Sequence, residues 1–519
     1  MTFRVTYATL SADNKELHAA FEAAIPTARK QLGGHHASIV NGAELNADDS
    51  FSTVSPIDRA VIVGTFGTAS EHDVDSAVNA ARDAFASWSR LSADQRCDIL
   101  DAGADLISER RNEISAVLTI EVGKNRLEAL GDVEETADLI RYYTHQMRTN
   151  NGFAQPMGRL SETDNTSDVL RPYGVWAVIA PFNFPAALSG GPIGAALIAG
   201  NTCVLKPSEI GSLTGLLIAK ALWDGGVPTN VLHVVFGPGE LTGRALVEHP
   251  KVDGITFTGS YSVGMDIYRR FATQYPKPAI CEMGGKNPVI VSRKADIDLA
   301  VEGTMRSAFG LTGQKCSAAS RAYIERPVYD EFVARLVAKA NGIIVGDPLD
   351  HSVWMGPLIN EDAVERYLDA TAQASTDGRV LCGGHRLTDG RLADGNFVAP
   401  TVVEVPVDSS LWETELFVPF ISVTAVDSLD EALSHANNTS LGLTAGFFST
   451  DQSEIDKFLN DIEAGVVYIN RRAGATTGAW PGVQPFGGWK GSGTGGKAGG
   501  GPYYLQQYLR EQSRTIVEG

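Results

Sequence analysis

A single cysteine, Cys316, lies in a run of small and polar residues, whereas a buried structural cysteine usually has bulky apolar neighbours. Residues 310–321 read GLTGQKCSAASR. A thiolate is the strongest nucleophile available to a protein near neutral pH, and glycines allow a substrate close to the backbone. The alternative is a small buried hydrophobic residue, which is the common role of a free cysteine. Cys316 is therefore a candidate nucleophile that needs support from the rest of the chain.

Two further polar groups suit the chemistry of a carbonyl substrate. Asn183 lies between two prolines in residues 181–185, PFNFP, and a carboxamide on a stiffened backbone can donate to an oxyanion. Glu282 leads into two glycines in residues 281–287, CEMGGKN. With access to water, this carboxylate could act as a general base. The alternatives are a turn asparagine and a turn glutamate.

Other loops carry residues that suit a nucleotide. Residues 206–209, KPSE, place a cation and an anion at a strand end, where they could bind ribose hydroxyls or form a surface ion pair. Glycines in later loops let backbone N–H groups reach a pyrophosphate at a helix start; they are Gly237, Gly239, Gly259 and Gly264. No GxGxxG follows the first strand, so the ordinary Rossmann fingerprint is missing.

A sheet must position these loops. Buried strands are predicted over about 175–180, 203–206, 231–236 and 254–258, with helical stretches between them. This alternation is typical of a parallel, doubly wound sheet, which binds ligands at the carboxyl edge of its strands. Because the candidate loops follow these strands, we expect them to meet at one edge.

The remaining segments are predicted from their periodicity. Helices are expected at about 70–90, 93–118 and 126–148, the first of them with Ser70 and Asp73 as a capping box. A second α/β run extends from 288 to about 470, and the glycine-rich residues 472–502 suit an ordered loop at a site. Two segments are expected to be extended: a two-stranded excursion over 150–172, and the tail 513–517, which could add to another sheet of this chain or of a partner subunit.

Composition excludes several function classes. The 519 residues contain 43 Lys and Arg against 62 Asp and Glu, for a net charge of −19. Such a surface repels phosphate backbones and anionic lipid, so neither nucleic acid nor a membrane is expected as the main partner. No run of about eighteen apolar residues occurs, and Met1–Thr6 lacks an apolar signal core. A cytoplasmic protein is expected.

The cysteines and histidines give no metal or disulfide pattern. Five cysteines are scattered without paired spacing, and the histidines are equally dispersed. An odd number of cysteines without CxxC fits a reducing compartment. We expect no metal.

Seven motifs in order resemble the NAD(P)-dependent aldehyde dehydrogenase superfamily over about residues 55–515. They are Asn183, Lys206, Gly259-Ser260, Glu282-Met283-Gly284-Gly285-Lys286, Gly313-Gln314-Lys315-Cys316, Glu415-Leu416-Phe417 and Pro485-Phe486-Gly487-Gly488. The resemblance implies that Cys316 attacks an aldehyde to give a thiohemiacetal and then a thioester. Asn183 and the Cys316 N–H would hold the oxyanion, and Glu282 would activate the water that releases the acid.

The same resemblance implies an NAD site. Lys206 and Glu415 would hold ribose hydroxyls, and Phe417 would pack on the cofactor. Glu209 would face the adenine ribose, where its charge disfavours a 2′-phosphate, so NAD is expected over NADP. The other implied cofactor contacts are Ser208, Gly239, Gly259, Ser260 and Gly264.

A narrower resemblance covers residues 478–505, which are similar to the branch of the superfamily that oxidises L-glutamate γ-semialdehyde in proline breakdown. It implies that Gly478, Ala479 and Ser317 bind the α-carboxylate, because backbone N–H groups donate without a bulky cation. The remaining implied substrate residues are Phe184 and Phe486, which would flank the aliphatic chain, and Glu135, which would help to order the site. Trp480 and Pro481 stand where smaller aliphatic residues are usual.

Two alternatives stay open. The substrate could be another aldehyde, such as succinate semialdehyde or another amino-acid semialdehyde. The chain could also be a silent structural or binding protein on this fold, although Cys316, Glu282 and Asn183 are all intact.

The resemblance also implies the architecture, an α/β fold of the aldehyde dehydrogenase type. A Rossmann-type NAD-binding domain would span 1–153 and 173–283, and an α/β catalytic domain 284–499. A small β oligomerisation element would span 154–172 and 500–519, giving a homodimer or a dimer-based oligomer.

Overall fold

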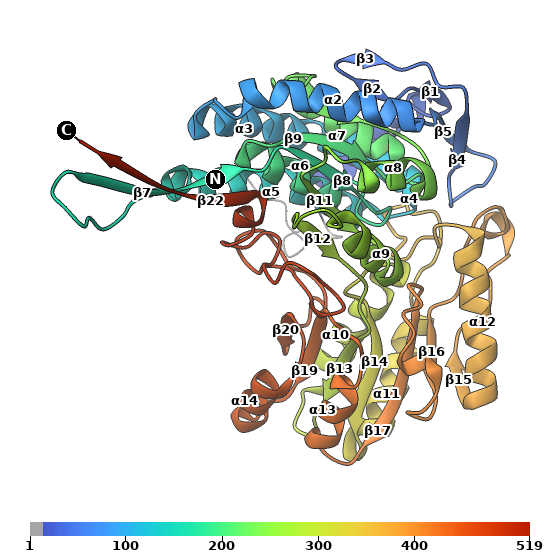
Figure 1. Cartoon of the computed structure of the whole chain (residues 1–519). Helices are drawn as coiled ribbons and strands as arrows, with labels where there is room; N and C mark the ends of the chain where they lie inside the picture. The colour runs from blue at the N-terminus through green and yellow to red at the C-terminus, as the bar shows by residue number, and fades with distance from the viewer. Residues whose placement is uncertain (1–13, 519) are drawn as a thin grey trace.

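The computed structural model describes residues 14–518. Met1–Thr6, inspected above for a targeting signal, lie outside the described residues. The chain forms two α/β halves and a long β-arm (Figure 1). Within the described residues, no helix combines the length and the apolarity that crossing a membrane requires.

Helices dominate the amino-terminal part; they are α1 (Lys15–Lys30), α2 (Glu71–Trp88), α3 (Ala93–Glu109), α4 (Arg111–Val122) and α5 (Arg126–Thr149). The capping box predicted for α2 is present, with the Ser70 and Asp73 side chains each bonded to the other residue's backbone N–H. The single helix predicted over 93–118 is wrong. The chain breaks at Arg110, whose backbone leaves the helical region (φ −89°, ψ 5°).

The first large sheet has the order β12-β11-β8-β9-β10-β2-β3. Its parallel strands are β8 (Val175–Ile179), β9 (Thr202–Lys206), β10 (Leu232–Val234), β11 (Gly254–Thr258) and β12 (Ala279–Glu282). The antiparallel edge is formed by β2 (Ile39–Val40) and β3 (Ala43–Glu44). The helices that accompany this sheet along the chain are α6 (Ala187–Ala199), α7 (Ser212–Asp224), α8 (Arg244–Glu248) and α9 (Tyr261–Phe271).

Side chains of β8 alternate between two buried clusters. Val175, Ala177 and Ile179 pack with α2 and α9, while Trp176 and Val178 pack with α3, α5, α6 and α7. Successive side chains of a strand point to opposite faces, so a strand that is covered on both faces needs an apolar residue at every position. This explains why the sequence of β8 is continuously apolar.

The second large sheet has the order β15-β16-β17-β14-β13-β19-β20. Its parallel strands are β13 (Asn287–Val291), β14 (Ala319–Glu325), β16 (Thr401–Glu404), β17 (Phe420–Val426), β19 (Thr444–Phe448) and β20 (Val466–Ile469), and β15 (Arg379–Cys382) pairs antiparallel with β16. The helices of this half are α10 (Ile297–Phe309), α11 (Arg326–Asn341), α12 (Glu361–Asp377), α13 (Leu429–Asn437) and α14 (Gln452–Asp461).

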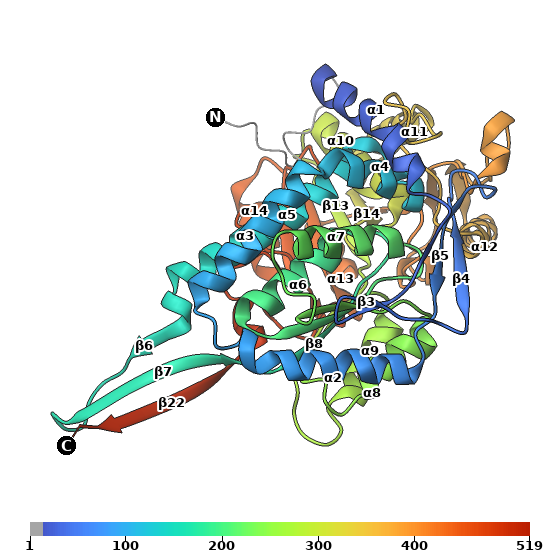
Figure 2. The ribbon, with the colours of Figure 1, turned by 90° about the horizontal axis from the view of Figure 1, so that it is seen from above.

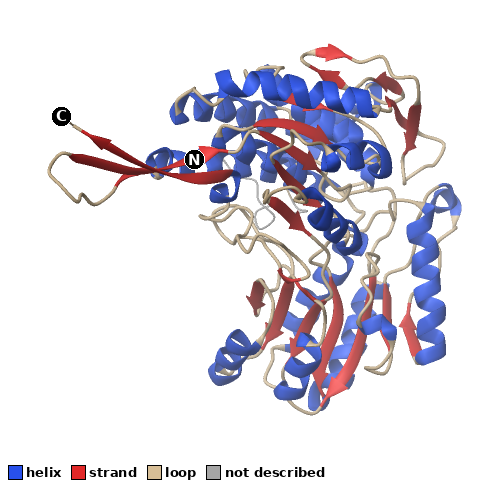
Figure 3. Ribbon diagram, in the orientation of Figure 1, coloured by secondary structure: helices blue, strands red, loops and turns tan. Residues whose placement is uncertain are grey.

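A short link joins the two large sheets. The strand β12 ends at Glu282 and β13 begins at Asn287. The chain therefore passes from the carboxyl edge of the first sheet to the amino edge of the second within residues 283–286. Loops at these two edges can share a site, and the helices surround both sheets (Figure 3).

The arm is a three-stranded antiparallel sheet of β6 (Ala154–Pro156), β7 (Asp164–Pro172) and β22 (Leu509–Val517). It projects from the body in both views (Figures 1 and 2). The tail strand pairs with β7 of its own chain, from Leu509 opposite Pro172 to Val517 opposite Asp164. Residues 505–508 form a short helix before the arm, with Tyr508 buried against Trp176.

Small sheets complete the fold; they are β1 (Gly34–His36) with β5 (Ile62–Gly67) and β4 (Ser50–Val54), and β18 (Leu441–Gly442) with β21 (Trp489–Lys490).

Candidate active site

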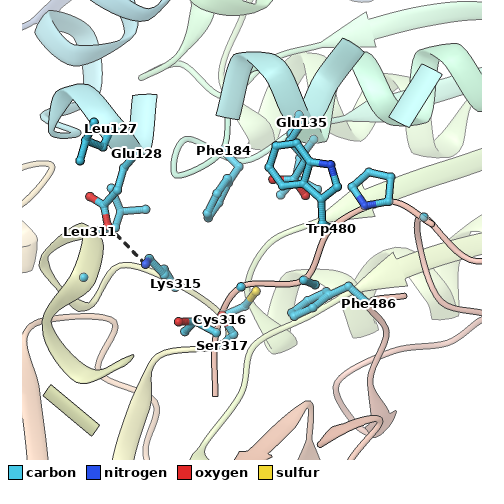
Figure 4. Close-up of a pocket in the computed structure, with 18 of the residues that line it drawn as sticks. Leu127, Glu128, Glu135, Phe184, Leu311, Lys315, Cys316, Ser317, Trp480 and Phe486 are labelled. Atoms are coloured by element: carbon cyan, nitrogen blue, oxygen red, sulfur yellow. Dashed lines mark ion pairs between the residues drawn. The ribbon is translucent and has the colours of Figure 1, made fainter. Parts of the chain in front are cut away.

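A cavity of about 370 Å³ opens between the two halves. Cys316 and Glu282 both line it, and so do all six residues predicted to contact the substrate; those six are Glu135, Phe184, Ser317, Gly478, Ala479 and Phe486. Figure 4 shows Cys316 and Ser317 on one wall, with Phe184 and Trp480 across the space from them.

The nucleophile loop connects α10 to β14 through an unusual turn. Leu311 and Thr312 have left-handed backbones, with φ of +52° and +56°, which is a strained conformation for residues with a side chain. Thr312 Oγ1 donates to the Gly356 carbonyl at 3.0 Å, and Gln314 Oε1 accepts from the Ile359 N–H at 2.9 Å. These bonds to a neighbouring segment hold the turn that presents Cys316.

Asn287, which sequence reasoning assigned no role, fixes the other side of this loop. Its Nδ2 donates to the carbonyls of Cys316 at 2.7 Å and Ala318 at 2.9 Å, and its Oδ1 accepts from the Thr444 N–H. A signal was present in the sequence, because Asn287 directly follows the Glu282 motif at the start of a strand.

The structure brings Asn183 next to the nucleophile loop. The side chain is buried and its Nδ2 donates to the carbonyl of Gln314 at 3.0 Å, two residues before Cys316. A carboxamide has two N–H donors, and no second acceptor for this Nδ2 occurs within residues 14–518. The remaining N–H is therefore unpaired within these residues, although Asn183 is not among the residues that line the cavity.

Burial favours the protonated form of the Cys316 thiol. It raises the pKa of Cys316 above the ordinary range, and the nearby carboxylates Glu282 and Glu415 raise it further. The neighbouring cation does not offset this effect, because Lys315 pairs with Glu128 at 3.3 Å. The resting thiol is therefore protonated at neutral pH, and it must lose this proton before it can attack a carbonyl carbon.

Glu282 is the last residue of β12 and carries a carboxyl group with one buried oxygen. Burial raises the pKa of Glu282 to about 8, against a smaller opposing effect of the Gly488 N–H. Its Oε1 atom is buried and accepts no hydrogen bond from any described residue. A carboxylate with a pKa near neutrality and a free lone pair is suited to proton transfer.

Predicted cofactor residues meet at the carboxyl edge of the first sheet. Lys206 Nζ lies 3.3 Å from Glu209 Oε2, and Glu209 Oε1 accepts from the Gly239 N–H at 2.9 Å. The carbonyl of Ser208 accepts from Ser212 at the start of α7. These residues belong to loops that follow β9 and β10, as the sheet topology predicted.

The next loop along this edge joins β11 to α9. Ser260 is the N-cap of α9 and accepts from the Val263 N–H. The Gly259 N–H donates to the carbonyl of Glu282 at 3.1 Å. A Cβ at Gly264 would approach Met283 Sδ to 2.5 Å, so this glycine allows α9 to pack against the segment that carries Glu282.

Glu415 and Phe417 approach from the second half. Glu415 Oε1 accepts from the Gly285 N–H at 2.9 Å, and burial raises its pKa to about 7. Phe417 has a positive φ of +58°, and its ring contacts Phe182 edge-on at 5.9 Å. None of the predicted cofactor residues lines the cavity described above.

The loop with Gly478 and Ala479 forms part of the cavity wall. Arg471 donates to the carbonyls of Thr477 at 2.7 Å and Gly478 at 2.8 Å. Trp480 Nε1 donates to Asp138 on α5 at 3.0 Å. Sequence reasoning missed Arg471 and Asp138, because nothing in their local sequences shows that they contact this loop.

The described residues contain no group of three or more His, Cys, Asp or Glu side chains arranged to hold a metal ion.

Comparison with known proteins agrees with this geometry. The model of the aldehyde dehydrogenase family matches residues 44–513. The chain is 37% identical over 505 residues to 1-pyrroline-5-carboxylate dehydrogenase 1 of Halalkalibacterium halodurans, covering 96% of each protein.

Solved structures give the same result. A crystal structure of 1-pyrroline-5-carboxylate dehydrogenase from Thermus with bound NAD is 33% identical, with a TM-score of 0.93, and the match covers 98% of this chain and 97% of that one. Proline utilization A from Bdellovibrio bacteriovorus is 36% identical with a TM-score of 0.93. This chain spans about half the length of the Bdellovibrio protein, since the match covers 52% of it.

Proposed function

The chain is a member of the aldehyde dehydrogenase family, and from this premise we propose that it oxidises L-glutamate γ-semialdehyde, the open form of 1-pyrroline-5-carboxylate, to L-glutamate with NAD. Relatives that cover nearly the whole chain carry the name 1-pyrroline-5-carboxylate dehydrogenase, which places the reaction in proline degradation. The observation that carries the proposal is one cavity that is lined by Cys316, by Glu282 and by the Gly478–Ala479 loop.

The first step uses the thiol and the amide. Cys316 Sγ gives up its proton to solvent water and attacks the aldehyde carbon as the thiolate, and the carbonyl oxygen becomes the oxyanion of a thiohemiacetal. The free N–H of Asn183 and the Cys316 backbone N–H would hold this oxygen. One such donor contributes about 3–4 kcal/mol to the transition state.

NAD, when bound, accepts the hydride that converts the thiohemiacetal on Cys316 into a thioester. The residues present fit such a group. A Cβ at Gly239 would meet no atom within 4 Å, which leaves open space at this loop, and Lys206 and Glu209 lie beside it. Lys206 and Glu415 would hold ribose hydroxyls, and the Glu209 carboxylate would repel a 2′-phosphate, which supports NAD over NADP.

Glu282 then takes a proton from water, which attacks the thioester and releases the acid from Cys316. The sum is an aldehyde, NAD⁺ and water giving a carboxylate, NADH and two protons. Glu282 is supported in this role by its free Oε1 and its pKa of about 8.

The loop of Gly478 and Ala479 accounts for the choice of aldehyde. The N–H groups of Gly478 and Ala479 donate to no acceptor within residues 14–518, and they would bind the α-carboxylate together with Ser317. Phe184 and Phe486 would pack on the aliphatic chain of the substrate.

Relative kcat/KM values test the substrate. Glutamate γ-semialdehyde should exceed 4-aminobutanal, the same chain without the α-carboxylate, by at least about 100-fold, because a site built for a polar group is left unpaired by the analogue. Succinate semialdehyde should also be a poor substrate. Equal values for glutamate γ-semialdehyde and 4-aminobutanal would contradict the proposal and favour a dehydrogenase of another aldehyde.

Two wider properties belong to the same proposal. A homodimer or dimer-based assembly is supported by the projecting arm, which exposes Leu160 and Ile516. A cytoplasmic location is supported by the cysteines, since Cys97, Cys203, Cys281, Cys316 and Cys382 are all free.

A further inference from the structure

Arg471 binds the loop of Gly478 and Ala479 through its guanidinium group. Its Nη1 donates to the carbonyl of Thr477 at 2.7 Å and its Nη2 to the carbonyl of Gly478 at 2.8 Å. The guanidinium also packs over the Tyr468 ring, with Cζ 4.8 Å from its centroid. One side chain thus binds two consecutive peptide groups.

The geometry of the peptide group fixes the direction of the two N–H groups when both carbonyls are held by Arg471. In a trans peptide the C=O and the N–H point in opposite directions. The peptide that carries the Thr477 carbonyl also carries the Gly478 N–H, and the next peptide carries the Gly478 carbonyl and the Ala479 N–H. Holding both carbonyls toward Arg471 therefore turns both N–H groups away from it.

The two N–H groups are available to a ligand. Neither donates a hydrogen bond to any group within residues 14–518. Both residues line the cavity that contains Cys316. Unpaired N–H groups at a cavity wall are suited to an anion, and the guanidinium polarises the peptides that carry them.

The backbone at this point accepts only glycine. Gly478 has φ +107°, and a Cβ there would lie 2.6 Å from Arg471 Nη2. The rest of the loop is fixed independently of Arg471, since Thr476 Oγ1 donates to the carbonyl of Ser317 at 2.6 Å and the Thr476 N–H donates to Ser307 Oγ. Removing the guanidinium should therefore free only the two peptide groups that it binds, and the rest of the loop should keep its position.

No carboxylate of residues 14–518 pairs directly with the guanidinium. Arg471 itself lines the cavity. A positive charge close to the two N–H groups raises their affinity for a carboxylate further.

We propose that Arg471 is the positioning residue that gives this enzyme its preference for aldehydes with a carboxylate at the other end. It aims the N–H groups of Gly478 and Ala479 and supplies the positive charge behind them. This inference rests on the proposed function, since it explains how the same cavity selects its substrate.

The test compares Arg471→Met with two controls. Arg471→Lys retains the charge, and Arg472→Met changes the neighbouring exposed arginine, which does not line the cavity. Each variant is assayed with glutamate γ-semialdehyde and with butanal, which has neither the carboxylate nor the amino group. L-Glutamate is also measured as a competitive inhibitor of butanal oxidation.

Arg471→Met should raise the KM for glutamate γ-semialdehyde and the Ki of L-glutamate by roughly 10- to 100-fold, the range for losing charge-assisted hydrogen bonds. Its kcat/KM for butanal should change by less than about threefold. Arg471→Lys should fall between Arg471→Met and the native enzyme, and Arg472→Met should match the native enzyme. An equal loss on both aldehydes, or an unchanged Ki for L-glutamate, would overturn the inference.

A failure of the role of Arg471 and a failure of the proposed function give different results. If Arg471→Met does not fold, as judged by its melting temperature, the Ki of L-glutamate for Arg471→Lys decides the matter, and a native value overturns the inference. A native enzyme without preference for glutamate γ-semialdehyde over butanal would refute the proposed function itself. A native preference that survives in Arg471→Met would refute only the role of Arg471.

Discussion

Glu282 can accept a proton only when it is ionised. Because burial raises its pKa, the ionised fraction depends on pH near neutrality. Because its pKa is raised to about 8, most copies of the enzyme carry the neutral acid at pH 7. The carboxylate fraction grows as pH rises through 8. The turnover of any step that needs this base must follow the same curve.

We therefore expect kcat to rise about tenfold per pH unit well below pH 8 and to level off above it. The measurement is steady-state NADH formation at saturating aldehyde and NAD between pH 6 and 9.5. Glu415, whose pKa is raised to about 7, should instead affect the KM for NAD. A kcat that is flat from pH 7 to 9 would contradict the assignment of Glu282 as the base.

Sequence alone singled out the candidate residues whose expected chemistry depends on their own neighbourhood. A lone cysteine among glycines, a carboxamide between prolines and a glutamate before glycines each mark a reactive group in their own neighbourhood. Asn287 and Arg471 work differently, because they act by binding backbone carbonyls that lie elsewhere in the chain. The sequence does not show which carbonyls a side chain will meet, so such residues were found only in the structure.

At the scale of elements, a buried ion pair connects the link between α4 and α5 with α5 itself and with the start of α6. Lys124 and Asp132 are both fully buried, with Nζ 2.9 Å from Oδ2. Asp132 also accepts from the Ala187 N–H at the start of α6, and Lys124 Nζ lies 3.5 Å from the centroid of the Phe184 ring. Burial lowers the pKa of Lys124 and raises that of Asp132, and their mutual attraction opposes both shifts.

Removing one partner should be costly, because it leaves the other charge buried and unpaired. We expect Lys124→Met to destabilise the protein by about 3–5 kcal/mol, and Lys124→Met with Asp132→Asn to recover part of this loss. Thermal melting followed by fluorescence measures both. The exposed pair Arg326–Asp427 provides the control, since Arg326→Met should cost no more than about 1 kcal/mol. Equal melting temperatures for Lys124→Met and Arg326→Met would contradict this account.

The type of most elements followed from periodicity, whereas some of their ends did not. Strand β8 and helix α2 carry continuous and period-3.6 apolar patterns that extend over their full lengths. The break between α3 and α4 at Arg110 has no glycine, proline or capping side chain to announce it. Packing against the rest of the fold sets this boundary, so the local sequence pattern does not predict where α3 ends and α4 begins.

At the scale of the whole molecule, the arm leaves apolar side chains in water. Leu160 is fully exposed at its tip, and Met157, Ile516 and Val517 are more than half exposed. The strand β22 is also at the edge of its sheet, with one side of its backbone unpaired. Natural proteins usually cover such edges, which supports association through the arm.

We expect the native protein to form at least a dimer in solution. Deleting residues 511–519 removes most of β22 and should yield a species of lower order, because the pairing surface is lost. Size-exclusion chromatography with light scattering gives the masses. A native monomer, or an assembly unaffected by the deletion, would show that the arm has another purpose.

The two large sheets contribute different parts of the reaction. Cys316 belongs to the second half and Glu282 ends a strand of the first, yet both line one cavity. The central claim is that these two residues act in sequence on one substrate, first forming and then hydrolysing a thioester. Glu282→Gln separates the two steps, since it removes the base and preserves the shape of the side chain.

The most direct measurement is rapid mixing of Glu282→Gln with glutamate γ-semialdehyde and NAD, followed by intact mass spectrometry. The account predicts a burst of about one NADH per active site, slow turnover afterwards, and an acyl group on Cys316 that is absent in Cys316→Ala. Unchanged steady-state turnover in Glu282→Gln, or NADH formation by Cys316→Ala at the native rate, would contradict it.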